Sequence, residues 1–389
     1  MQQSAITPNT VRSESPIAVV GGSLVGPLLA LLLAQAGFSN VQVYEATPAT
    51  VPQAGGVIGL DWVSLDILDS VGVDQREIIP FQSERVVSIK IADRREVGRF
   101  YTIYPGRNTT WTLLHQALVS RLPNGTFHAG KRLAGISGDD GSQAVLLFAD
   151  GSRVKSDFVV FADGRKSLGR KLLDPARQLR YAGYVAARGQ IDLDPLAVRD
   201  FTRYEPGLGQ FNIFPIALAD GAVGLDWTLY INSGPDRFRE WFGASPTSRT
   251  FVLPHQVSEQ ARLAVDHLAE QILTSATAEL VHSTTKRMAA SIVDIDPPSQ
   301  MVYSVAGSRA VLLGDALAPV RPHTAKGANL GIEQAAGLAQ LLRQHRKFGA
   351  HLDAALTDWQ ARHLPQVAAT IVLGPQIAQR FGLGLGEAR

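Results

Sequence analysis

Glycines at a fixed spacing give the first indication of chemistry in this chain. Gly21, Gly22 and Gly26 follow the apolar run 17–20, and a second apolar strand-like run, 41–44, ends at Glu45. A glycine turn lets the backbone bend sharply and approach a pyrophosphate with no Cβ in the way. A helix that opens at such a turn offers free N–H groups to phosphate, and an acid after the second strand can accept hydrogen bonds from a ribose diol. The pattern predicts a dinucleotide-binding strand–helix–strand unit.

The same stretch departs from the dinucleotide-binding pattern at one position. Ser23 stands where the second glycine is expected, so the glycines alone also fit an ordinary strand-to-helix turn. Glu45 follows Gly21 by 24 residues (45 − 21), close to the spacing at which an acid meets the ribose. The strand, helix, second strand and terminal acid together favour cofactor binding.

Two further strand-like runs end in an acid beside a glycine. Residues 158–161 lead to Asp163-Gly164, and residues 310–313 lead to Gly314-Asp315. An acid at the end of a strand can hold a polyol hydroxyl. A loop with two prolines follows Asp315, and a helix is expected to begin within 327–329, where its N-terminus can stabilise negative charge.

The elements that position these residues are of two kinds. Buried parallel strands and partner helices are expected around the glycine turns, whereas residues 84–104 alternate apolar and polar side chains as antiparallel strands do. The runs 184–191, 209–217 and 222–231 are also strand-like and rich in aromatic residues. An antiparallel sheet lined with aromatics is suited to cover a planar substrate.

Composition narrows the classes of partner. The 389 residues carry 37 Lys and Arg against 35 Asp and Glu, a net charge of +2, and no basic patch points to nucleic acid or an anionic membrane. The apolar stretch 17–36 is interrupted by glycines and a proline, so we expect buried core and no membrane span. The absence of cysteine excludes disulfides and thiolate sites, and a cytoplasmic protein with a small-molecule ligand is expected.

Taken together, these motifs resemble the FAD-dependent group A aromatic hydroxylases, the family of para-hydroxybenzoate and salicylate hydroxylases. The order of the glycine turn, Asp163-Gly164 and Gly314-Asp315, with Pro322 eight residues after Gly314 (322 − 314), carries the resemblance over residues 16–365. The segments 181–189 and 321–325 look most like the 2,6-dihydroxypyridine hydroxylase branch.

The resemblance implies an α/β fold in which a Rossmann-type FAD-binding domain is interleaved with an antiparallel-sheet substrate domain. We expect a disordered tail at 1–14, an FAD-binding domain formed by 15–180 and 281–350, and a substrate domain at 181–280 to which part of 60–105 contributes. Residues 351–389 are expected to form a C-terminal helical segment. A monomer or homodimer is expected.

The resemblance also implies which positions border FAD. These are Gly21, Gly22, Ser23, Gly26, Glu45, Ala46, Trp111, Asp163, Gly164, Asp315, Pro322, Gly327, Ala328 and Asn329. Several positions depart from the family: Trp111 stands where an arginine is usual, Ala46 where arginine is frequent, and Phe161 where a glycine precedes Ala-Asp-Gly. These departures fit a loosely held or exchangeable flavin, and they leave the core glycine pattern intact.

The activity implied is hydroxylation of a phenolic or N-heteroaromatic ring through a flavin hydroperoxide, with O2 as co-substrate and NADH or NADPH as transient reductant. His323 is the leading candidate for a general base, with a loop histidine as the alternative. His282, on a strand-like segment, is a second candidate, with a structural histidine as the favoured alternative. Arg188 is a candidate for holding an anionic substrate or assisting flavin movement, with an ordinary salt bridge at a strand end as the alternative. Phe214, Trp227 and Tyr230 are candidates for the substrate pocket, with core packing as the alternative.

Two other classes of function stay open on the sequence. The same scaffold supports Baeyer–Villiger insertion, epoxidation or oxidation without oxygen transfer, which differ only in substrate placement. The departures at Trp111, Phe161 and the segment Ala316-Leu-Ala318 also fit a degenerate flavin-binding protein without turnover.

Overall fold

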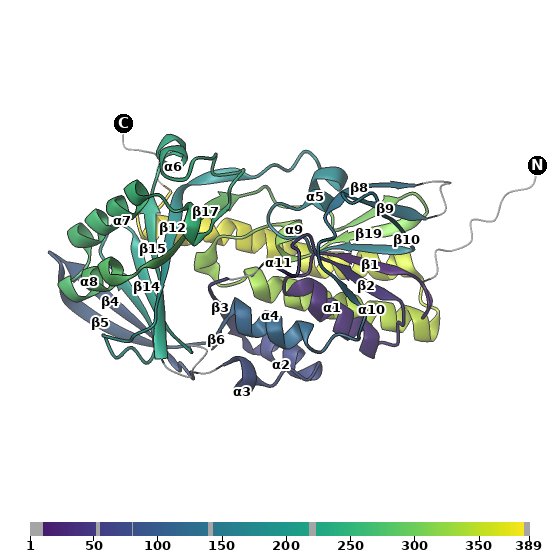
Figure 1. The fold of residues 1–389 in the computed structure, drawn as a ribbon. Helices are drawn as coiled ribbons and strands as arrows, with labels where there is room; N and C mark the ends of the chain where they lie inside the picture. The colour runs from purple at the N-terminus through teal and green to yellow at the C-terminus, as the bar shows by residue number, and fades with distance from the viewer. Residues whose placement is uncertain (1–10, 52–54, 80, 139–142, 218–222, 385–389) are drawn as a thin grey trace, which may run out of the picture.

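Two large sheets, joined by long helices, make up the molecule in the computed structural model (Figure 1). The structure describes residues 11–384 except 52–54, 80, 139–142 and 218–222. The first ten residues of the expected N-terminal tail therefore lie outside the described residues. Val11, within the same expected tail, is instead 3% exposed and packs on the core of the first sheet.

The first sheet is six-stranded, in the order β18-β19-β11-β1-β2-β7. Its strands are β1 (Ile17–Val20), β2 (Val41–Tyr44), β7 (Phe127–His128), β11 (Phe158–Phe161), β18 (Val302–Val305) and β19 (Ser308–Leu312). All neighbours are parallel except β18 and β19. Because parallel strands point the same way, the segments that follow β1, β2, β11 and β19 meet at one edge of the sheet.

Helices cover one face of this sheet, and a small three-stranded sheet packs on the other through Ala144, Leu146 and Phe148. Both faces are thus buried, which explains the continuous apolar runs of the strands. Near it lie α1 (Val25–Gln35), α2 (Trp62–Ser70), α3 (Gln75–Ile78), α4 (Trp111–Val119), α5 (Leu168–Leu173), α9 (Gly314–Leu317) and α10 (Gly327–Phe348). Two small sheets flank them, formed by β3 (Val57–Asp61) with β6 (Gly106–Thr110), and by β8 (Leu133–Gly138), β9 (Ala144–Phe148) and β10 (Arg153–Ser156).

The second sheet is eight-stranded, in the order β16-β17-β12-β15-β14-β13-β4-β5. Its strands are β4 (Arg85–Ala92), β5 (Arg95–Ile103), β12 (Arg180–Ile191), β13 (Phe201–Glu205), β14 (Gln210–Ala217), β15 (Val223–Asn232), β16 (Phe251–Val252) and β17 (Lys286–Asp294). Every pair is antiparallel except β13 with β4. Strand β17 belongs to this sheet, although the sequence placed its residues with the nucleotide-binding region.

The two faces of the eight-stranded sheet differ in what covers them. The outer face packs on α6 (Pro235–Phe242), α7 (Glu259–Ile272) and α8 (Ser275–Ser283), as Figure 1 shows. Alternate residues of the strands point to the inner face. That face meets α11 (Leu352–Arg380), the following residue Phe381, and the 3-10 turn η2 (Pro322–Thr324); a second such turn, η1, is Pro254–Gln256.

Helix α11 connects the two sheets. Its 29 residues span about 44 Å at 1.5 Å per residue, and it contacts α10, β18 and η2 along its length. Ala378 at its far end, and Leu383 three residues beyond the helix, are buried against Tyr184 and Tyr230 on the inner face. The C-terminal segment therefore packs on the body of its own chain.

Candidate active site

The glycine turn after β1 lies tightly against the end of β11. Gly21 has a φ of +111°, and a Cβ on it would overlap the carbonyl of Ala162. A Cβ on Gly26 would overlap the carbonyl oxygen of Gly21, so α1 begins as close to the turn as backbone contact allows. The predicted dinucleotide-binding geometry is therefore present in the backbone.

Glu45 closes this turn from the end of β2. Its Oε2 accepts a hydrogen bond from the backbone N–H of Gly22 at 2.8 Å, and its Oε1 accepts one from Thr47 at 2.7 Å. A carboxylate oxygen has more than one acceptor site, so both oxygens can also receive a ligand hydroxyl. Ala46 is half-buried beside it.

Trp111 covers the turn from the start of α4. Its indole Nε1 donates to Ser23 Oγ at 2.9 Å, and its ring stacks on His115 with centroids 4.4 Å apart. His115 Nε2 lies 2.9 Å from the carbonyl oxygen of Gly22, and burial lowers the pKa of His115. His115 was not among the residues predicted from the sequence; its position one helical turn after Trp111 was the available signal.

Asp163 and Asp315 end neighbouring strands but have different surroundings. The carboxylate of Asp163 accepts from Ser167 Oγ at 2.5 Å and from the N–H groups of Leu168 and Gly169 at 2.7 and 3.2 Å. It thereby caps the start of α5, although burial raises its pKa. Gly164 follows with a φ of +73°.

Asp315 follows β19, at the edge of the six-stranded sheet where the ends of the parallel strands meet. Among the described residues none donates a hydrogen bond to this carboxylate, which is half-buried. Burial raises its pKa, and the nearby Arg165 and Arg170 oppose that shift. A Cβ built on Gly327 would lie 3.6 Å from Asp315 Oδ1, so the acid faces the beginning of α10.

The start of α10 is fixed by Asn329. Its Oδ1 accepts from the N–H of Asp61 at 3.1 Å, and its Nδ2 donates to the carbonyls of Gly59 and Ala325 at 3.0 and 2.7 Å. Gly327 and Ala328 precede it in the first turn, where backbone N–H groups have no intrahelical partner. Asn329 thus orders the helix N-terminus, and the N–H groups of the first turn are left for a ligand.

His323, in η2 directly after Pro322, lies on the inner face of the eight-stranded sheet. Its Nδ1 is 3.0 Å from Gln210 Oε1 and its Nε2 is 3.0 Å from the Tyr184 hydroxyl. Because a carbonyl oxygen only accepts, Nδ1 carries the proton and Nε2 accepts from Tyr184. Burial, with Arg321 and Arg203 nearby, lowers the pKa of His323 to about 3. The imidazole is neutral and both of its nitrogens are hydrogen-bonded, which favours a positioning role for His323 over that of a general base.

Arg188 lies where the inner face meets the nucleotide-binding half. Its Nη2 is 3.4 Å from Oδ1 of the buried Asp226, and its Nε is buried with no hydrogen-bond partner in the described parts of the chain. A Cβ on Gly56 would overlap the guanidinium, and one on Gly55 would lie 2.6 Å from Trp111 Cβ. Arg188 therefore lies against Gly56, and the preceding Gly55 lies against Trp111, which covers the glycine turn after β1.

Two of the predicted site residues lie elsewhere. Trp227 points to the outer face, is fully buried in the core under α6 and α7, and donates through Nε1 to Thr284 Oγ1 at 2.8 Å. His282 lies on helix α8, where a strand was expected, and its Nε2 is 3.1 Å from Glu270. The pocket prediction for Trp227 and the catalytic prediction for His282 are therefore corrected, because the sheet separates the outer face from His323.

The other two pocket candidates lie on the inner face. Phe214 stacks on Phe201 with centroids 4.4 Å apart, and Tyr230 lies 4.4 Å from the His323 ring. Burial raises the pKa of Tyr230 to about 12, so its hydroxyl stays protonated at neutral pH.

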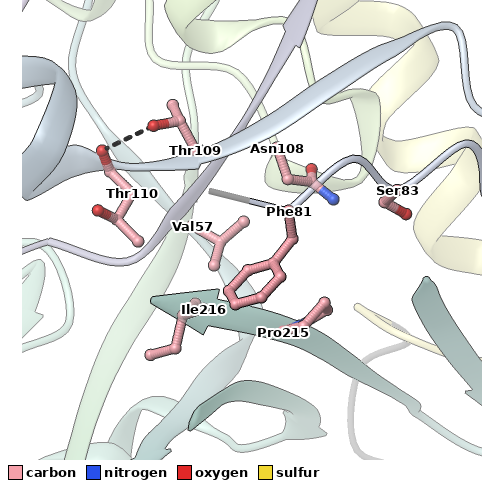
Figure 2. Close-up of a pocket in the computed structure, with 8 residues that line it drawn as sticks. All are labelled: Val57, Phe81, Ser83, Asn108, Thr109, Thr110, Pro215 and Ile216. Carbon is pink, nitrogen blue, oxygen red and sulfur yellow. Dashed lines mark hydrogen bonds between the residues drawn. The ribbon is translucent and has the colours of Figure 1, made fainter. Parts of the chain in front are cut away.

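A hollow between β14 and the β3–β6 sheet continues this face. Figure 2 shows Val57, Phe81 and Ile216 turned toward one another around it, with Asn108 at one side. The residues lining it are Val57, Phe81, Ser83, Asn108, Thr109, Thr110, Pro215 and Ile216. None of them was predicted from the sequence, because the hollow is formed by four segments that are far apart along the chain.

Comparison with known proteins identifies the family. A model of the FAD binding domain family matches residues 14–369. The chain belongs to this family. It is 31% identical to the 6-hydroxynicotinate 3-monooxygenase of Pseudomonas fluorescens, over 87% of this chain and 85% of that protein. It is 28% identical to the 2,6-dihydroxypyridine 3-monooxygenase of Paenarthrobacter nicotinovorans, over 95% of this chain and 92% of that protein.

The fold agrees with this membership. The solved 2,6-dihydroxypyridine-3-hydroxylase of Arthrobacter nicotinovorans superposes with a TM-score of 0.82 at 25% identity, covering 98% of this chain and 96% of that one. The predicted resemblance to FAD-dependent aromatic hydroxylases, the α/β fold class and FAD as cofactor are confirmed. Across the described ranges, no helix has the length and apolar character needed to cross a membrane.

Proposed function

We propose that this chain is an FAD-dependent monooxygenase that takes electrons from NADH or NADPH and inserts one oxygen atom of O2 into a phenolic or N-heteroaromatic ring. The observation that carries the proposal is the family match over residues 14–369. The aromatic-lined inner face of the eight-stranded sheet also lies next to Gly55 and Gly56, beside the nucleotide-binding half. When bound, FAD supplies the activation of O2, and the protein supplies binding and orientation.

The chain's own residues fit the cofactor in three places. Gly21 and Gly22 leave room for a pyrophosphate at the start of α1, and Glu45 lies beside them for a ribose. Asp315 presents a carboxylate with open acceptor sites to a polyol hydroxyl. The first turn of α10, at Gly327, directs its N–H groups and positive partial charge to the same edge.

The catalytic candidates divide between the two halves of the site. Arg188, held against Gly56 near Trp111, is assigned to the flavin side. His323 Nε2 accepts a hydrogen bond from the Tyr184 hydroxyl, which fixes both rings beside Tyr230 and gives the substrate a rigid wall. A rigid wall of this kind orients the ring and excludes water from the site.

The named relatives guide the choice of substrate. The two curated relatives act, as their names say, on 6-hydroxynicotinate and 2,6-dihydroxypyridine, so hydroxypyridines are the first class to assay. The proposed setting is the cytoplasm, where NADH and NADPH are supplied, and the proposed assembly is a monomer or homodimer.

The test is NADH and NADPH oxidation by FAD-reconstituted protein, with O2 uptake and hydrogen peroxide release recorded together. The panel comprises hydroxypyridines, simple phenols and bicyclic phenols. Stimulation by one ring class with little peroxide is expected. No stimulation by any ring, with FAD shown to be bound, would refute the proposal.

A further inference from the structure

Arg203 and Asn212 face each other on the inner face of the eight-stranded sheet. They are directly opposite in the register of β13 and β14. The next opposed pair, Tyr204 and Phe211, packs into the outer core, so alternation places Arg203 and Asn212 on the inner face. Gln210, two residues before Asn212 on the same face, is bonded to His323.

The guanidinium of Arg203 is fixed by two aromatic rings. Its central carbon lies 5.5 Å from the ring centroid of Phe201 and 5.9 Å from that of Phe381. Contact with ring faces holds a cation in place and leaves the N–H edge of its guanidinium open. Phe381 comes from the segment after α11, so the C-terminal end of the chain helps to hold this arginine.

Arg203 has polar capacity that the protein leaves unused. Its Nε is buried without a hydrogen-bond partner, and no carboxylate in the described segments lies within ion-pair distance of it. Buried cations in proteins are normally paired, because desolvation of an unpaired charge is costly. An open cation at this position therefore points to a ligand that accepts hydrogen bonds.

Asn212 adds an unpaired hydrogen-bond acceptor to the unpaired donor of Arg203. The residue is 7% exposed, and its Oδ1 is buried without a partner. Native proteins leave few buried polar atoms unpaired, because each one loses its hydrogen bonds to water without replacement. A buried donor and a buried acceptor, opposed across two adjacent strands, are therefore complementary to a ligand edge that carries an acceptor beside a donor.

Aromatic rings complete the surroundings of this pair. Phe201 stacks on Phe214, and Tyr104 meets Phe201 edge to face at 6.2 Å. On the other side, Phe381 lies 6.2 Å from the His323 ring. The open polar pair therefore lies among rings that suit a flat ligand.

We propose that Arg203 and Asn212 form the polar subsite that selects and orients the aromatic substrate. Arg203 donates to a ring oxygen, either oxo or oxyanion, and Asn212 Oδ1 accepts from the adjacent ring N–H or O–H. The ligand class is a ring with an oxygen substituent next to a hydrogen-bond donor, as in a 2-pyridone. This inference rests on the proposed function and names the residues that determine its specificity.

The test compares Arg203→Gln and Asn212→Ala with the wild-type holoenzyme. The matched control is Arg239→Gln, an exposed arginine on α6 behind the sheet. The probes are 2-pyridone and N-methyl-2-pyridone, which lacks the N–H, and binding is measured from the change in flavin absorbance. FAD content is recorded for each variant.

Arg203→Gln is expected to weaken 2-pyridone binding by about 10- to 100-fold, the range for a hydrogen bond to a charged group. Asn212→Ala is expected to bring the two probes to similar affinity, whereas the wild type and Arg239→Gln prefer 2-pyridone. A merely structural defect would weaken both probes alike and leave their ratio unchanged. If Arg203→Gln does not fold, Arg203→Lys retains the charge without the planar fork and is expected to lie between the two.

The inference is overturned if both variants keep the wild-type affinities and ratio, or if the wild type binds neither pyridone. These outcomes are separable from failure of the proposed function. An enzyme that hydroxylates other rings of the panel while the variants behave as wild type would reject the subsite alone.

Discussion

Two acids at neighbouring strand ends, Asp315 and Asp163, should respond oppositely to replacement by alanine. The carboxylate of Asp163 accepts three hydrogen bonds from the start of α5, whereas that of Asp315 accepts none from the described residues. Asp315→Ala is therefore expected to lower FAD affinity and to leave the apoprotein folded. Asp163→Ala is expected to lower the stability of the apoprotein.

The size of each effect follows from these contacts. A hydrogen bond between a carboxylate and a ligand hydroxyl contributes about 1.5–3 kcal/mol, so Asp315→Ala should raise the FAD dissociation constant roughly 10- to 150-fold. Loss of a helix cap costs about 0.5–2 kcal/mol, which sets the expected loss of unfolding free energy in Asp163→Ala.

Apoprotein stability at different pH values gives an independent check on Asp315. Burial raises its pKa, so the folded state binds this proton more tightly than the unfolded state does. The ionised carboxylate therefore costs stability, and this cost appears as pH rises from the unfolded pKa of about 3.8 through the raised folded pKa. Apo Asp315→Ala should be at least as stable as wild type at pH 7, and that advantage should shrink below about pH 4.

FAD affinity is measured by titrating apoprotein and following flavin fluorescence, and stability by chemical denaturation of the same samples. Unchanged FAD affinity in Asp315→Ala would refute the assigned role. Unfolding of that variant, together with an unaffected Asp163→Ala, would refute the distinction between the two acids.

Three further substitutions test separate parts of the site. Gly21→Ala forces a side chain into a position with φ of +111° and against Ala162, so we expect a loss of about 1–3 kcal/mol in unfolding free energy and weaker FAD binding; normal behaviour in denaturation and FAD titration would contradict this. His323 has a folded pKa of about 3, below its unfolded value of about 6.5, so the folded protein loses stability as the pH falls from 6.5 toward 3. His323→Gln should therefore resist acid unfolding better than the wild type. The pH–rate profile of the wild type should show no inflection from this histidine near pH 6.5. Trp227→Phe should lower the unfolding free energy by about 1–3 kcal/mol and leave kcat and KM unchanged, because the ring and its hydrogen bond to Thr284 lie on the outer face of the sheet. A large change in KM would instead indicate that Trp227 contacts the substrate.

The nucleotide-binding half could be predicted from the sequence because its signals are local. A strand, a glycine turn and a helix occupy adjacent residues, and the acid Glu45 follows at a fixed distance. Alternation of apolar and polar side chains likewise indicated the strands within 84–104 before the structure placed them beside β13.

The face of the antiparallel sheet that carries the candidate site was harder to predict from the sequence. Trp227 and Tyr230 are three residues apart on β15, so they must point to opposite faces, and the pattern already excluded both from one pocket. The alternation does not indicate which of the two faces is covered by α6, α7 and α8. The sequence predicts a strand at His282, whereas the structure has a helix, because the apolar residues Leu280 and Val281 form too short a run to reveal a helical period.

Contacts between segments that are far apart along the chain could not be predicted from sequence patterns. The difference between Asp163 and Asp315 depends on which N–H groups surround each carboxylate, and both acids follow similar strands. The open pair Arg203 and Asn212 is visible only when β13, β14 and Phe381 are brought together in space.

The central claim is that one atom of O2 enters an aromatic ring. The direct measurement is mass spectrometry of the product formed by FAD-loaded protein from NADH or NADPH and a hydroxypyridine under ¹⁸O2. The account predicts one ¹⁸O atom in a new ring hydroxyl, with product formed in step with reductant consumed. Oxidised product without ¹⁸O, or reductant consumption that yields only hydrogen peroxide across the whole panel, would contradict it.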